Sequence, residues 1–290
     1  MPDSPPAAIA VEPGLHLLAT PIGAVRDITL RALDLLAGAQ VLAAEDTRSL
    51  RRLMDIHGVA LGGRPLLSYH DHNATRIRPK LLAALAGGAS VAYASEAGTP
   101  LVADPGFALV RAAIAEGHVV RAAPGPSAVL AALTVSGLPS DRFLFAGFPP
   151  PQPAARRRWA EELRAVPATL VVYESPRRVG ELLSVVCEVW GEGRPAALCR
   201  ELTKRFEEVR RGTLAELAAG MAEAPVRGEV VLVVDRAPVR AADAAVGLED
   251  LLAARLRDLS LKAAVAEVAE VTGLPRRQVY QAALRMSGRD

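Results

Sequence analysis

The chain has 290 residues and a formal net charge of +2, and 51% of its residues are hydrophobic while 23% are charged. This composition describes a soluble, well-cored protein that is long enough for two domains. The charge does not by itself require a nucleic-acid partner, and the aromatic content of 4% argues against a sheet that stacks RNA bases on aromatic rings. No apolar run approaches the roughly 20 residues that span a bilayer.

The N-terminal segment and the cysteines indicate the cellular compartment of the protein. Residues 1–13 are rich in Pro and Ala and lack a basic segment before an apolar one, so we expect a disordered tail and not a signal peptide. Cys187 and Cys199, the only cysteines, lie in apolar runs and predict buried free thiols in a reducing compartment. We therefore expect a cytoplasmic protein with no membrane partner.

Strand-like and helix-like segments alternate through residues 14–137, which predicts an N-terminal α/β domain with a mostly parallel sheet. The predicted strands are 15–19, 40–44, 66–69, 90–94 and 119–123. The predicted helices are 30–37, a short one through Leu53, 73–86, one from Asp104 and 127–136.

A second α/β domain is predicted over residues 138–236. Its strands are expected at 143–147, 169–173, 196–200, 207–211 and 229–234, and its helices from about 154, over 179–190 and over 214–222. The segment 205–211 lacks the apolar run of a buried parallel strand, so we expect a mixed sheet.

The remaining residues predict a linker and a small helical domain. Residues 237–246 are Ala/Pro-rich, and 247–290 resemble a helix–turn–helix with Gly273 at a helix end and Pro275 at a helix start. Such units bind nucleic acid or serve only in packing, and the sequence leaves both open.

Three Pro/Gly turns each follow a predicted strand of the first domain. They are TPIG (residues 20–23), SEAGTP (95–100) and PGPS (124–127). Small residues at such positions let backbone groups reach a ligand at the carboxyl edge of a parallel sheet. One such segment alone is as well explained by a tight loop, but three together predict a ligand site.

Polar clusters follow other predicted strands. They are Glu45-Asp46-Thr47-Arg48, His70-Asp71-His72-Asn73, Glu174 to Arg178 and Arg200 to Lys204. The two histidines superficially suggest a metal site, but neither a third ligand nor a known spacing is present, so we expect no metal. The chain has no GxGxxG, no GxxxxGK[ST] and no serine nucleophile elbow. These absences argue against a dinucleotide-binding enzyme, a P-loop nucleotide-binding enzyme and a serine hydrolase of the nucleophile-elbow type.

Ten motifs occur in an order that resembles one family. They are TPIG, AEDTR, HDHN, SEAGTP, DPG, PGPS, GLPSDRF, YESP, RELTK and RGEVVLVV, over about residues 14–235. Together they resemble the ribosomal RNA small subunit methyltransferase I family of the tetrapyrrole methylase superfamily, and the helical tail is similar to that family's C-terminal extension.

The resemblance implies a fold, a reaction and partners. The fold would be a two-domain tetrapyrrole-methylase-like α/β fold with S-adenosylmethionine held between the domains. The reaction would be 2′-O-methylation of a cytidine ribose in the decoding region of 16S rRNA, on the assembled small ribosomal subunit. Members of the family are usually homodimers, and we expect neither a membrane nor DNA as a partner.

The resemblance also implies site residues. The expected cofactor-binding residues are Pro21, Gly23, Ser95, Glu96, Ala97, Gly98, Leu101, Pro124, Gly125, Ser127, Tyr173 and Leu202. The expected substrate-binding residues are Arg48, His70, His72, Arg177 and Lys204. The chain departs from the family pattern at Glu96, where Asp is common, and at Ala24, where Asn is common.

Methyl transfer from a sulfonium depends mainly on alignment, but the proton of a ribose hydroxyl must pass to a base or to water. Glu45, Asp46 and Glu201 are candidates by location, and the sequence does not choose among them or exclude a structural role for each.

We also expect Arg156, Arg157 and Arg158 to present positive charge to RNA, with a solvated helix face as the alternative.

Two other interpretations compete with this one. The first is a methyltransferase of a porphyrinoid ring or other small molecule on the same fold, which the AEDTR, HDHN and GLPSDRF segments and the helical extension disfavour. The second is a non-enzymatic nucleic-acid-binding module, which the intact cofactor-type turns disfavour.

Overall fold

The computed structural model describes residues 10–103, 105–223, 226–237, 241–272 and 274–286. The described residues form two compact units, one within Met1–Arg164 and Thr169–Asp235 and the other within Ala165–Ala168 and Arg236–Asp290. The sequence predictions for residues 1–9, Asp104, residues 238–240, Gly273 and residues 287–290 lie outside the described residues.

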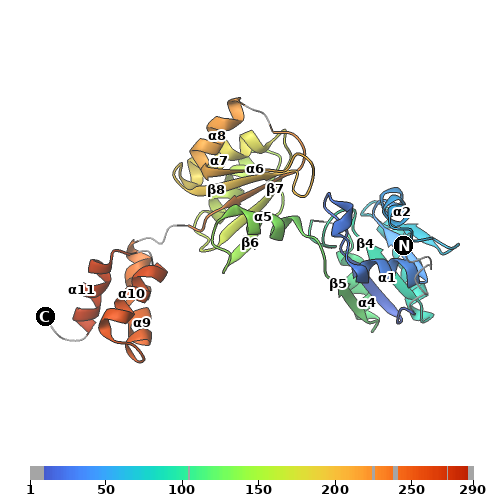
Figure 1. Cartoon of the computed structure of the whole chain (residues 1–290), viewed down its shortest axis with the longest axis horizontal. Helices are drawn as coiled ribbons and strands as arrows, with labels where there is room; N and C mark the ends of the chain where they lie inside the picture. The colour runs from blue at the N-terminus through green and yellow to red at the C-terminus, as the bar shows by residue number, and fades with distance from the viewer. Residues whose placement is uncertain (1–9, 104, 224–225, 238–240, 273, 287–290) are drawn as a thin grey trace, which may run out of the picture. The chain divides into compact units, whose positions relative to one another are not determined.

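The first sheet is fully parallel, with the strand order β3-β2-β4-β1-β5 (Figure 1). Its strands are β1 (Gly14–Leu18), β2 (Val41–Ala44), β3 (Leu66–Ser68), β4 (Ser90–Ala94) and β5 (Val120–Ala123). Its helices are η1 (Val25–Asp27), α1 (Leu30–Gly38), α2 (Thr47–Ile56), α3 (Ala74–Ala86) and α4 (Phe107–Ala115). The predicted parallel sheet is confirmed.

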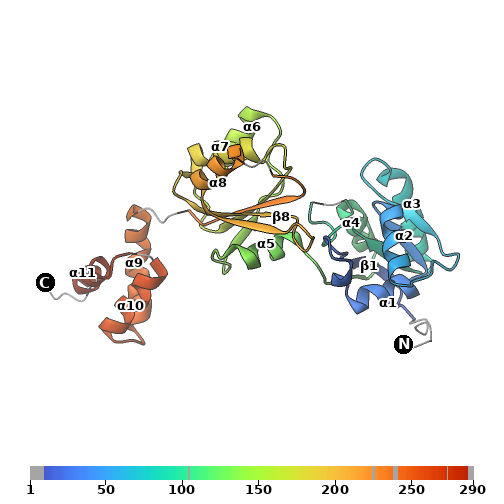
Figure 2. The same ribbon diagram turned by 45° about the horizontal axis from the view of Figure 1, so that its top comes forward.

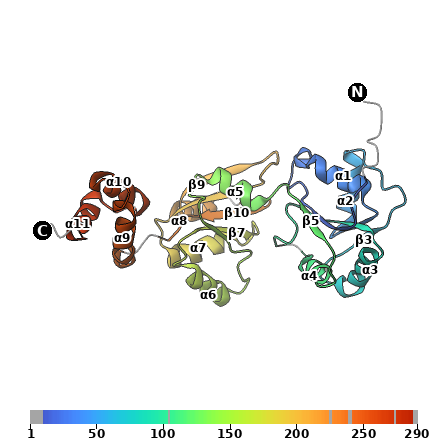
Figure 3. The ribbon, with the colours of Figure 1, turned by 90° about the horizontal axis from the view of Figure 1, so that it is seen from below.

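Helices cover both faces of this sheet. Leu36 of α1 and Met54 of α2 are buried in one core cluster, while Leu81 of α3 and Leu109 of α4 are buried in another. Figure 3 shows α1 and α2 on one side and α3 and α4 on the other. Burial from both sides explains why β4 is a continuous apolar run with every residue buried.

The second sheet is mixed, with the order β6-β7-β10-β8-β9. Only β6 and β7 pair in parallel, and the other three pairs are antiparallel. Its strands are β6 (Phe143–Phe145), β7 (Thr169–Glu174), β8 (Pro195–Arg200), β9 (Glu208–Thr213) and β10 (Val230–Val234). The predicted mixed pairing is confirmed.

Four helices flank the second sheet. They are α5 (Ala128–Ser136), α6 (Pro153–Leu163), α7 (Val179–Trp190) and α8 (Leu214–Glu223). Figure 2 shows α6, α7 and α8 on one face and α5 on the other. Val129 and Leu133 of α5 share a core cluster with Val171 and Val233 of the sheet.

This packing of α5 differs from the sequence prediction, which placed the helix in the first domain. Five of the nine residues of this helix are Ala or Val, and a sixth is the exposed Leu130. Apolar residues therefore lie all around the helix, and its sequence does not mark a single buried face. Its apolar spacing therefore identified a helix without identifying the sheet that it covers.

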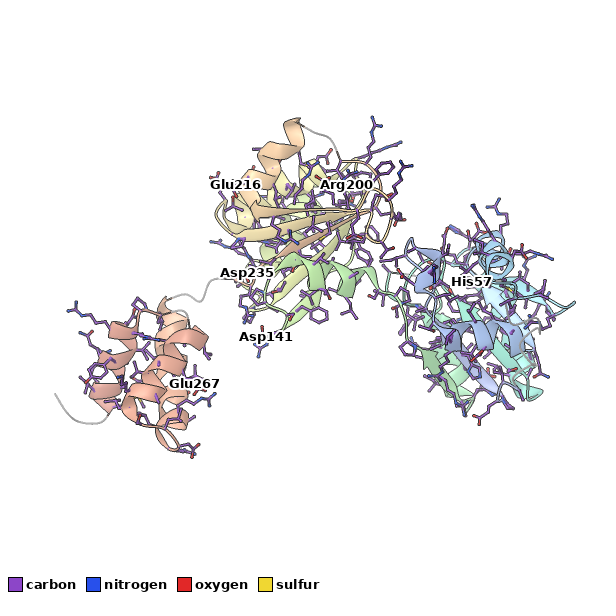
Figure 4. The ribbon with its side chains drawn as sticks, viewed as in Figure 1. His57, Asp141, Arg200, Glu216, Asp235 and Glu267 are labelled. Carbon is purple, nitrogen blue, oxygen red and sulfur yellow. The ribbon has the colours of Figure 1, made fainter. Side chains whose placement is uncertain are left out.

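Three helices build the C-terminal unit: α9 (Ala241–Leu256), α10 (Leu261–Thr272) and α11 (Arg276–Met286). Leu252, Val268 and Val279 are buried in a core of their own. Arg255 of α9 and Glu267 of α10 form an ion pair of 2.6 Å, and Figure 4 labels Glu267.

The start of α9 differs from the sequence prediction. The helix begins at Ala241, inside the segment 237–246 predicted as a linker. Alanine has the highest helix propensity, so the Ala-rich part of that segment continues the helix. Among the described residues, no helix combines the length and the apolar composition needed to cross a membrane.

Candidate functional site

The three Pro/Gly turns lie side by side, because β4, β1 and β5 are neighbours in the first sheet. Thr20 and Gly98 exchange two backbone hydrogen bonds of 2.9 Å, which join the TPIG turn to the SEAGTP turn. The Thr99 hydroxyl donates to the Pro126 carbonyl at 3.0 Å, which joins the SEAGTP turn to the PGPS turn. The predicted row of turns along one sheet edge is confirmed.

A first pocket of about 350 Å³ opens beside these turns, and residues at the ends of β7 and β10 complete its lining. Four of the predicted cofactor-binding residues line it: Ala97, Gly98, Ser127 and Tyr173. Four others line a neighbouring second pocket: Pro21, Gly23, Ser95 and Glu96. The remaining four line neither of these two pockets: Leu101, Pro124, Gly125 and Leu202.

The first pocket has apolar walls and one buried carboxylate. Glu174 is only 2% exposed, and its Oε1 accepts hydrogen bonds from the Ser175 backbone at 2.7 Å and from Arg178 Nε at 2.9 Å. Its Oε2 is buried and accepts no hydrogen bond from the described residues. Leaving a buried acceptor unpaired is costly, so this oxygen is available to an N–H or O–H donor that can reach it.

The backbone beside the pocket has unusual conformations. Gly98 has a φ of +80°, and a Cβ there would lie 3.3 Å from Ile22 Cγ2, so only glycine fits without strain. Among the described residues, the non-glycine residues with positive φ are Leu101 and Ala103, just beyond the SEAGTP turn, and Glu201 and Thr203, after β8. Such conformations concentrate at ligand sites.

The second pocket has a volume of about 400 Å³ and adjoins the first, because Ile22 and Ala97 line both. It is formed by the TPIG turn, the start of the SEAGTP turn and one face of α2. Two exposed charged side chains line it, Arg52 and Glu96.

The three candidate bases have different surroundings. The Asp46 carboxylate accepts hydrogen bonds from the side chain and backbone of Arg48 and from the Ser49 backbone, which cap α2 and lower the pKa of Asp46. The Glu201 carboxylate accepts hydrogen bonds from the Glu229 backbone at 2.9 Å and from Lys204 Nζ at 3.0 Å, which lower its pKa. Both carboxylates are held in structural roles and are weakened as bases.

Glu45 is the exception. Burial raises the pKa of its carboxyl, and the neighbouring carboxylates of Glu96 and Asp71 raise it further. No hydrogen bond to its carboxylate is present within the described part of the chain. A partly buried carboxylate with a raised pKa at a sheet edge has the properties of a general base.

The predicted substrate-binding residues lie in dissimilar places. The Arg48 side chain is 92% exposed and pairs with Asp46 at 3.2 Å. The rings of His70 and His72 lie 5.9 Å apart, and the Asn73 amide lies 3.1 Å from His70 Nε2.

The other two predicted substrate-binding residues, Arg177 and Lys204, differ in their exposure and their ion pairs. Arg177 is exposed in the turn after β7. Lys204 Nζ donates to Glu201 at 3.0 Å and to Glu229 at 2.9 Å, so two carboxylates neutralise its charge.

The prediction that the triplet Arg156, Arg157 and Arg158 faces RNA is wrong for its first member. Arg156 is 1% exposed, and its guanidinium donates to the carbonyls of Pro150 and Pro151 and to Glu181. Arg157 pairs with Glu188 at 2.6 Å. Of these three residues, only Arg158 is exposed and forms no ion pair with a described residue, because Arg156 and Arg157 pair with Glu181 and Glu188 of α7.

His70 Nε2 lies within hydrogen-bond distance of the Asn73 side-chain amide. No group of three or more His, Cys, Asp or Glu side chains in the described ranges could hold a metal ion.

Some pocket residues carried no assignment in the sequence analysis. In the first pocket these include Phe148, Glu174, Gly228 and Glu229, and in the second Val25, Ser49, Arg52 and Ile56. The YESP and RGEVVLVV motifs contain Glu174, Gly228 and Glu229, so the signal was in motifs already recognised. The α2 residues gave no such signal, because nothing in a helical pattern marks a pocket wall.

Comparisons with known proteins agree with this geometry. The profile of a family described as Tetrapyrrole (Corrin/Porphyrin) Methylases matches residues 14–218, and one described as RsmI C-terminal HTH domain matches residues 241–287. The chain is 50% identical over 277 residues to the ribosomal RNA small subunit methyltransferase I of Mesorhizobium japonicum, covering 95% of this chain and 93% of that protein.

Solved structures share the fold. A cobalt precorrin-4 methyltransferase of cobalamin biosynthesis is similar with a TM-score of 0.57 and 17% identity, over 76% of this chain and 94% of that one. A uroporphyrin-III C-methyltransferase from Thermus thermophilus, complexed with S-adenosylhomocysteine, is similar with a TM-score of 0.51 and 22% identity, over 77% of this chain and 97% of that one.

Proposed function

The chain belongs to the tetrapyrrole methylase family of methyltransferases, and from this membership we propose that it methylates 16S rRNA of the small ribosomal subunit. The methyl donor is S-adenosylmethionine, and the acceptor that we propose is the ribose 2′-hydroxyl of a cytidine in the decoding region. The observation that carries the proposal is the first pocket, which the SEAGTP and PGPS turns line together with Glu174, whose buried Oε2 accepts no hydrogen bond from the described residues.

The residues of the first pocket fit the cofactor. When bound, S-adenosylmethionine supplies an electrophilic methyl group on a sulfonium. The Glu174 carboxylate offers an acceptor for a cationic or N–H group, and Tyr173 and Val231 offer apolar contact. Gly98 keeps the turn free of a side chain, so the backbone lies close to the ligand.

We propose Glu45 as the base that accepts the proton of the ribose hydroxyl. Its carboxylate is partly buried, faces like charges and has no hydrogen bond that holds it in a structural role among the described residues. Asp46 and Glu201 position α2 and the loop after β8 instead.

The choice of an RNA substrate is supported by the relatives of the chain. The Mesorhizobium relative, whose name specifies small-subunit ribosomal RNA, matches along 95% of this chain, whereas the porphyrinoid enzymes share only the fold at 17–22% identity. The match of residues 241–287 to the profile described as RsmI C-terminal HTH domain also supports an RNA substrate. We also propose a cytoplasmic protein, because small ribosomal subunits are in the cytoplasm, and the family resemblance supports a homodimer.

Two measurements test the proposal. Equilibrium dialysis with labelled S-adenosylmethionine should show binding, and labelled cofactor should transfer its methyl group to small subunits from a strain that lacks this modification. Mapping the modified nucleotide then identifies the acceptor atom. Cofactor binding without transfer to subunits would contradict the RNA substrate, and absence of cofactor binding would contradict the site.

The variant Ser175→Trp tests the pocket assignment directly. Ser175 lines the first pocket, and an indole there would occupy the space assigned to the cofactor. We expect cofactor affinity to fall by at least about tenfold, equivalent to about 1.4 kcal/mol. Unchanged affinity in the folded variant would show that the cofactor binds elsewhere.

A further inference from the structure

The first pocket, to which we assign the cofactor, leaves the second pocket without an assigned ligand; the TPIG turn, Glu96 and α2 line this second pocket. Its volume of about 400 Å³ lies within the range of roughly 300–1,000 Å³ that small-molecule sites occupy. Because Ile22 and Ala97 line both pockets, a group bound in the second would lie next to the cofactor. A methyl acceptor requires such a position.

Three contacts preform the walls of the second pocket. Nε2 of His57, which Figure 4 labels, lies 2.9 Å from the Val25 carbonyl oxygen and fastens the end of α2 to η1. At the other end of α2, the Asp46 carboxylate caps the helix. The backbone N–H of Ala24 donates to Thr203 Oγ1 at 3.0 Å, which fixes the TPIG turn from outside.

The lining combines apolar side chains with two charged side chains, Arg52 and Glu96, that have no partner among the described residues. Val25 and Ile56, which line the pocket, are 38% and 50% exposed and are therefore accessible to a ligand. Arg52 and Glu96 have no hydrogen bond or ion pair with any residue that the structure describes. A guanidinium and a carboxylate that share a pocket without pairing are available to a ligand with both donors and acceptors.

Cytosine matches this pair of charges. Its Watson–Crick edge presents one amino donor beside two adjacent acceptors, N3 and O2. A carboxylate accepts from the amino group, as it does at cytosine N4 in nucleic-acid complexes, and the fork of an arginine donates to adjacent acceptors. Uracil presents an acceptor where cytosine has the amino group, so it would face the Glu96 carboxylate unfavourably.

We propose that the second pocket receives the cytosine base of the nucleotide whose ribose is methylated, with Glu96 and Arg52 reading its Watson–Crick edge. The base leaves its stack and lies between Val25 and Ile56, as bases of single-stranded RNA do in protein pockets. This inference rests on the proposed function and specifies its substrate-binding side. Glu96 is then a specificity-determining residue of the acceptor site and not a cofactor ligand.

The first test blocks the pocket. Ser49 lines the second pocket but not the first, so Ser49→Trp should fill the space for the base and leave cofactor affinity unchanged. We expect methyl transfer to subunits to fall by at least about 100-fold, as expected when a site loses its positioning contacts. Asp55→Trp is the matched control, because Asp55 is an exposed residue of the same helix that does not line the pocket.

The second test exchanges hydrogen-bonding character. Small subunits carrying cytidine or uridine at the target position are compared as substrates for the wild type and for Glu96→Gln. The wild type should prefer cytidine by about 10- to 100-fold, the range of discrimination that one base-edge contact supplies. The amide of Glu96→Gln can donate to uracil O4, so the preference should shrink or reverse.

The outcomes separate this inference from the proposed function. If Ser49→Trp methylates subunits as the wild type does, or if it loses cofactor affinity, the second pocket is not the base site. An unchanged preference for cytidine in Glu96→Gln overturns the role of that residue. If the wild type transfers no methyl group to either substrate although it binds cofactor, the proposed function itself fails.

Discussion

At the scale of single residues, the same functional group takes different roles according to its neighbours. Asp46 and Glu201 accept several hydrogen bonds, which stabilise their charged forms. Glu45 lies among like charges and is partly buried, so its charged form is disfavoured. The sequence places all three after predicted strands, but only the structure separates Glu45, the base that we propose, from the two carboxylates that accept several hydrogen bonds.

Replacing Glu45 tests its role as the base. Glu45→Gln should lower the rate of methyl transfer by about 10²- to 10⁴-fold, the usual contribution of general acid–base catalysis, and leave cofactor affinity unchanged. Single-turnover transfer to subunits and equilibrium dialysis measure the two quantities. A variant that transfers at the wild-type rate would assign the proton to water or to another group.

The pH dependence gives a second measurement of the same role. A base must be deprotonated, so the rate should fall as the pH drops through the pKa of Glu45, which burial, Glu96, Asp71 and Asp46 raise above its ordinary value while His70 lowers it. Asp71→Asn removes one like charge, so its acid limb should move to lower pH. An acid limb that does not move would show that the titrating group is not Glu45.

At the scale of single elements, α6 shows how a charged triplet in the sequence divides its roles. Arg156→Met should lower the free energy of unfolding by about 1–3 kcal/mol, because it leaves the carbonyls of Pro150 and Pro151 without their donors. Arg158→Met, the control at an exposed position, should change it by less than about 0.5 kcal/mol. Urea unfolding compares the two, and equal effects would contradict the buried role of Arg156.

Ion pairs at Glu208, where β8 pairs with β9, make a pH-dependent contribution to the free energy of unfolding. Arg200, which Figure 4 labels, and Arg210 both donate to Glu208 and lower the pKa of its carboxyl to about 2. Because this pKa is depressed on folding, the stabilisation is complete above the unfolded value of about 4.5 and is lost as the pH falls toward 2.

The expected effect of removing this carboxylate is modest. The Glu208 side chain is 36% exposed, so solvent screening limits the loss in Glu208→Gln to about 0.5–1 kcal/mol at neutral pH. Urea unfolding of both proteins at neutral pH and near pH 3 measures the difference, which should shrink in acid. A difference independent of pH would indicate that packing, not charge, accounts for the effect.

The elements were predictable where local pattern decides and not where tertiary partners decide. The strand β4 and the helix α7 follow from apolar runs and helical spacing, and the structure has both within a residue of their predicted ends. The packing of α5 depends on strands far along the chain, and the burial of Arg156 depends on the turn before α6 and on Glu181 of α7, which helical spacing does not reveal. The second pocket was missed for the same reason, because α2 and the TPIG turn meet only in the fold.

At the scale of the whole molecule, the packing of α5 bears on the domain boundaries. Because α5 shares its core with the second sheet, we propose that the second domain begins near Ser127 and not after Gly137. The first domain would then end with β5 and the PGPS turn. The last domain would begin with α9, since Leu248, Leu252 and Val265 belong to a core that includes no residue of either sheet among those described.

The C-terminal unit should therefore be separable from cofactor binding. We expect a truncated chain of residues 1–240 to fold and to bind S-adenosylmethionine within about twofold of the full chain, since the residues of the first pocket all precede residue 232. Methyl transfer to small subunits should be slower, because the helix–turn–helix unit presents Arg276 and Arg277, both exposed, at the start of α11.

A charge-reversed full-length chain separates loss of charge from loss of the unit. Replacing Arg276 and Arg277 by Glu should weaken subunit binding and flatten its dependence on salt, because phosphate contacts release counterions. Titrations of subunit binding at several salt concentrations measure the slope, with dialysis as the check on the cofactor site. Full activity of the truncated chain would show that the unit does not engage the subunit, whereas loss of cofactor binding would place it in the core of the enzyme.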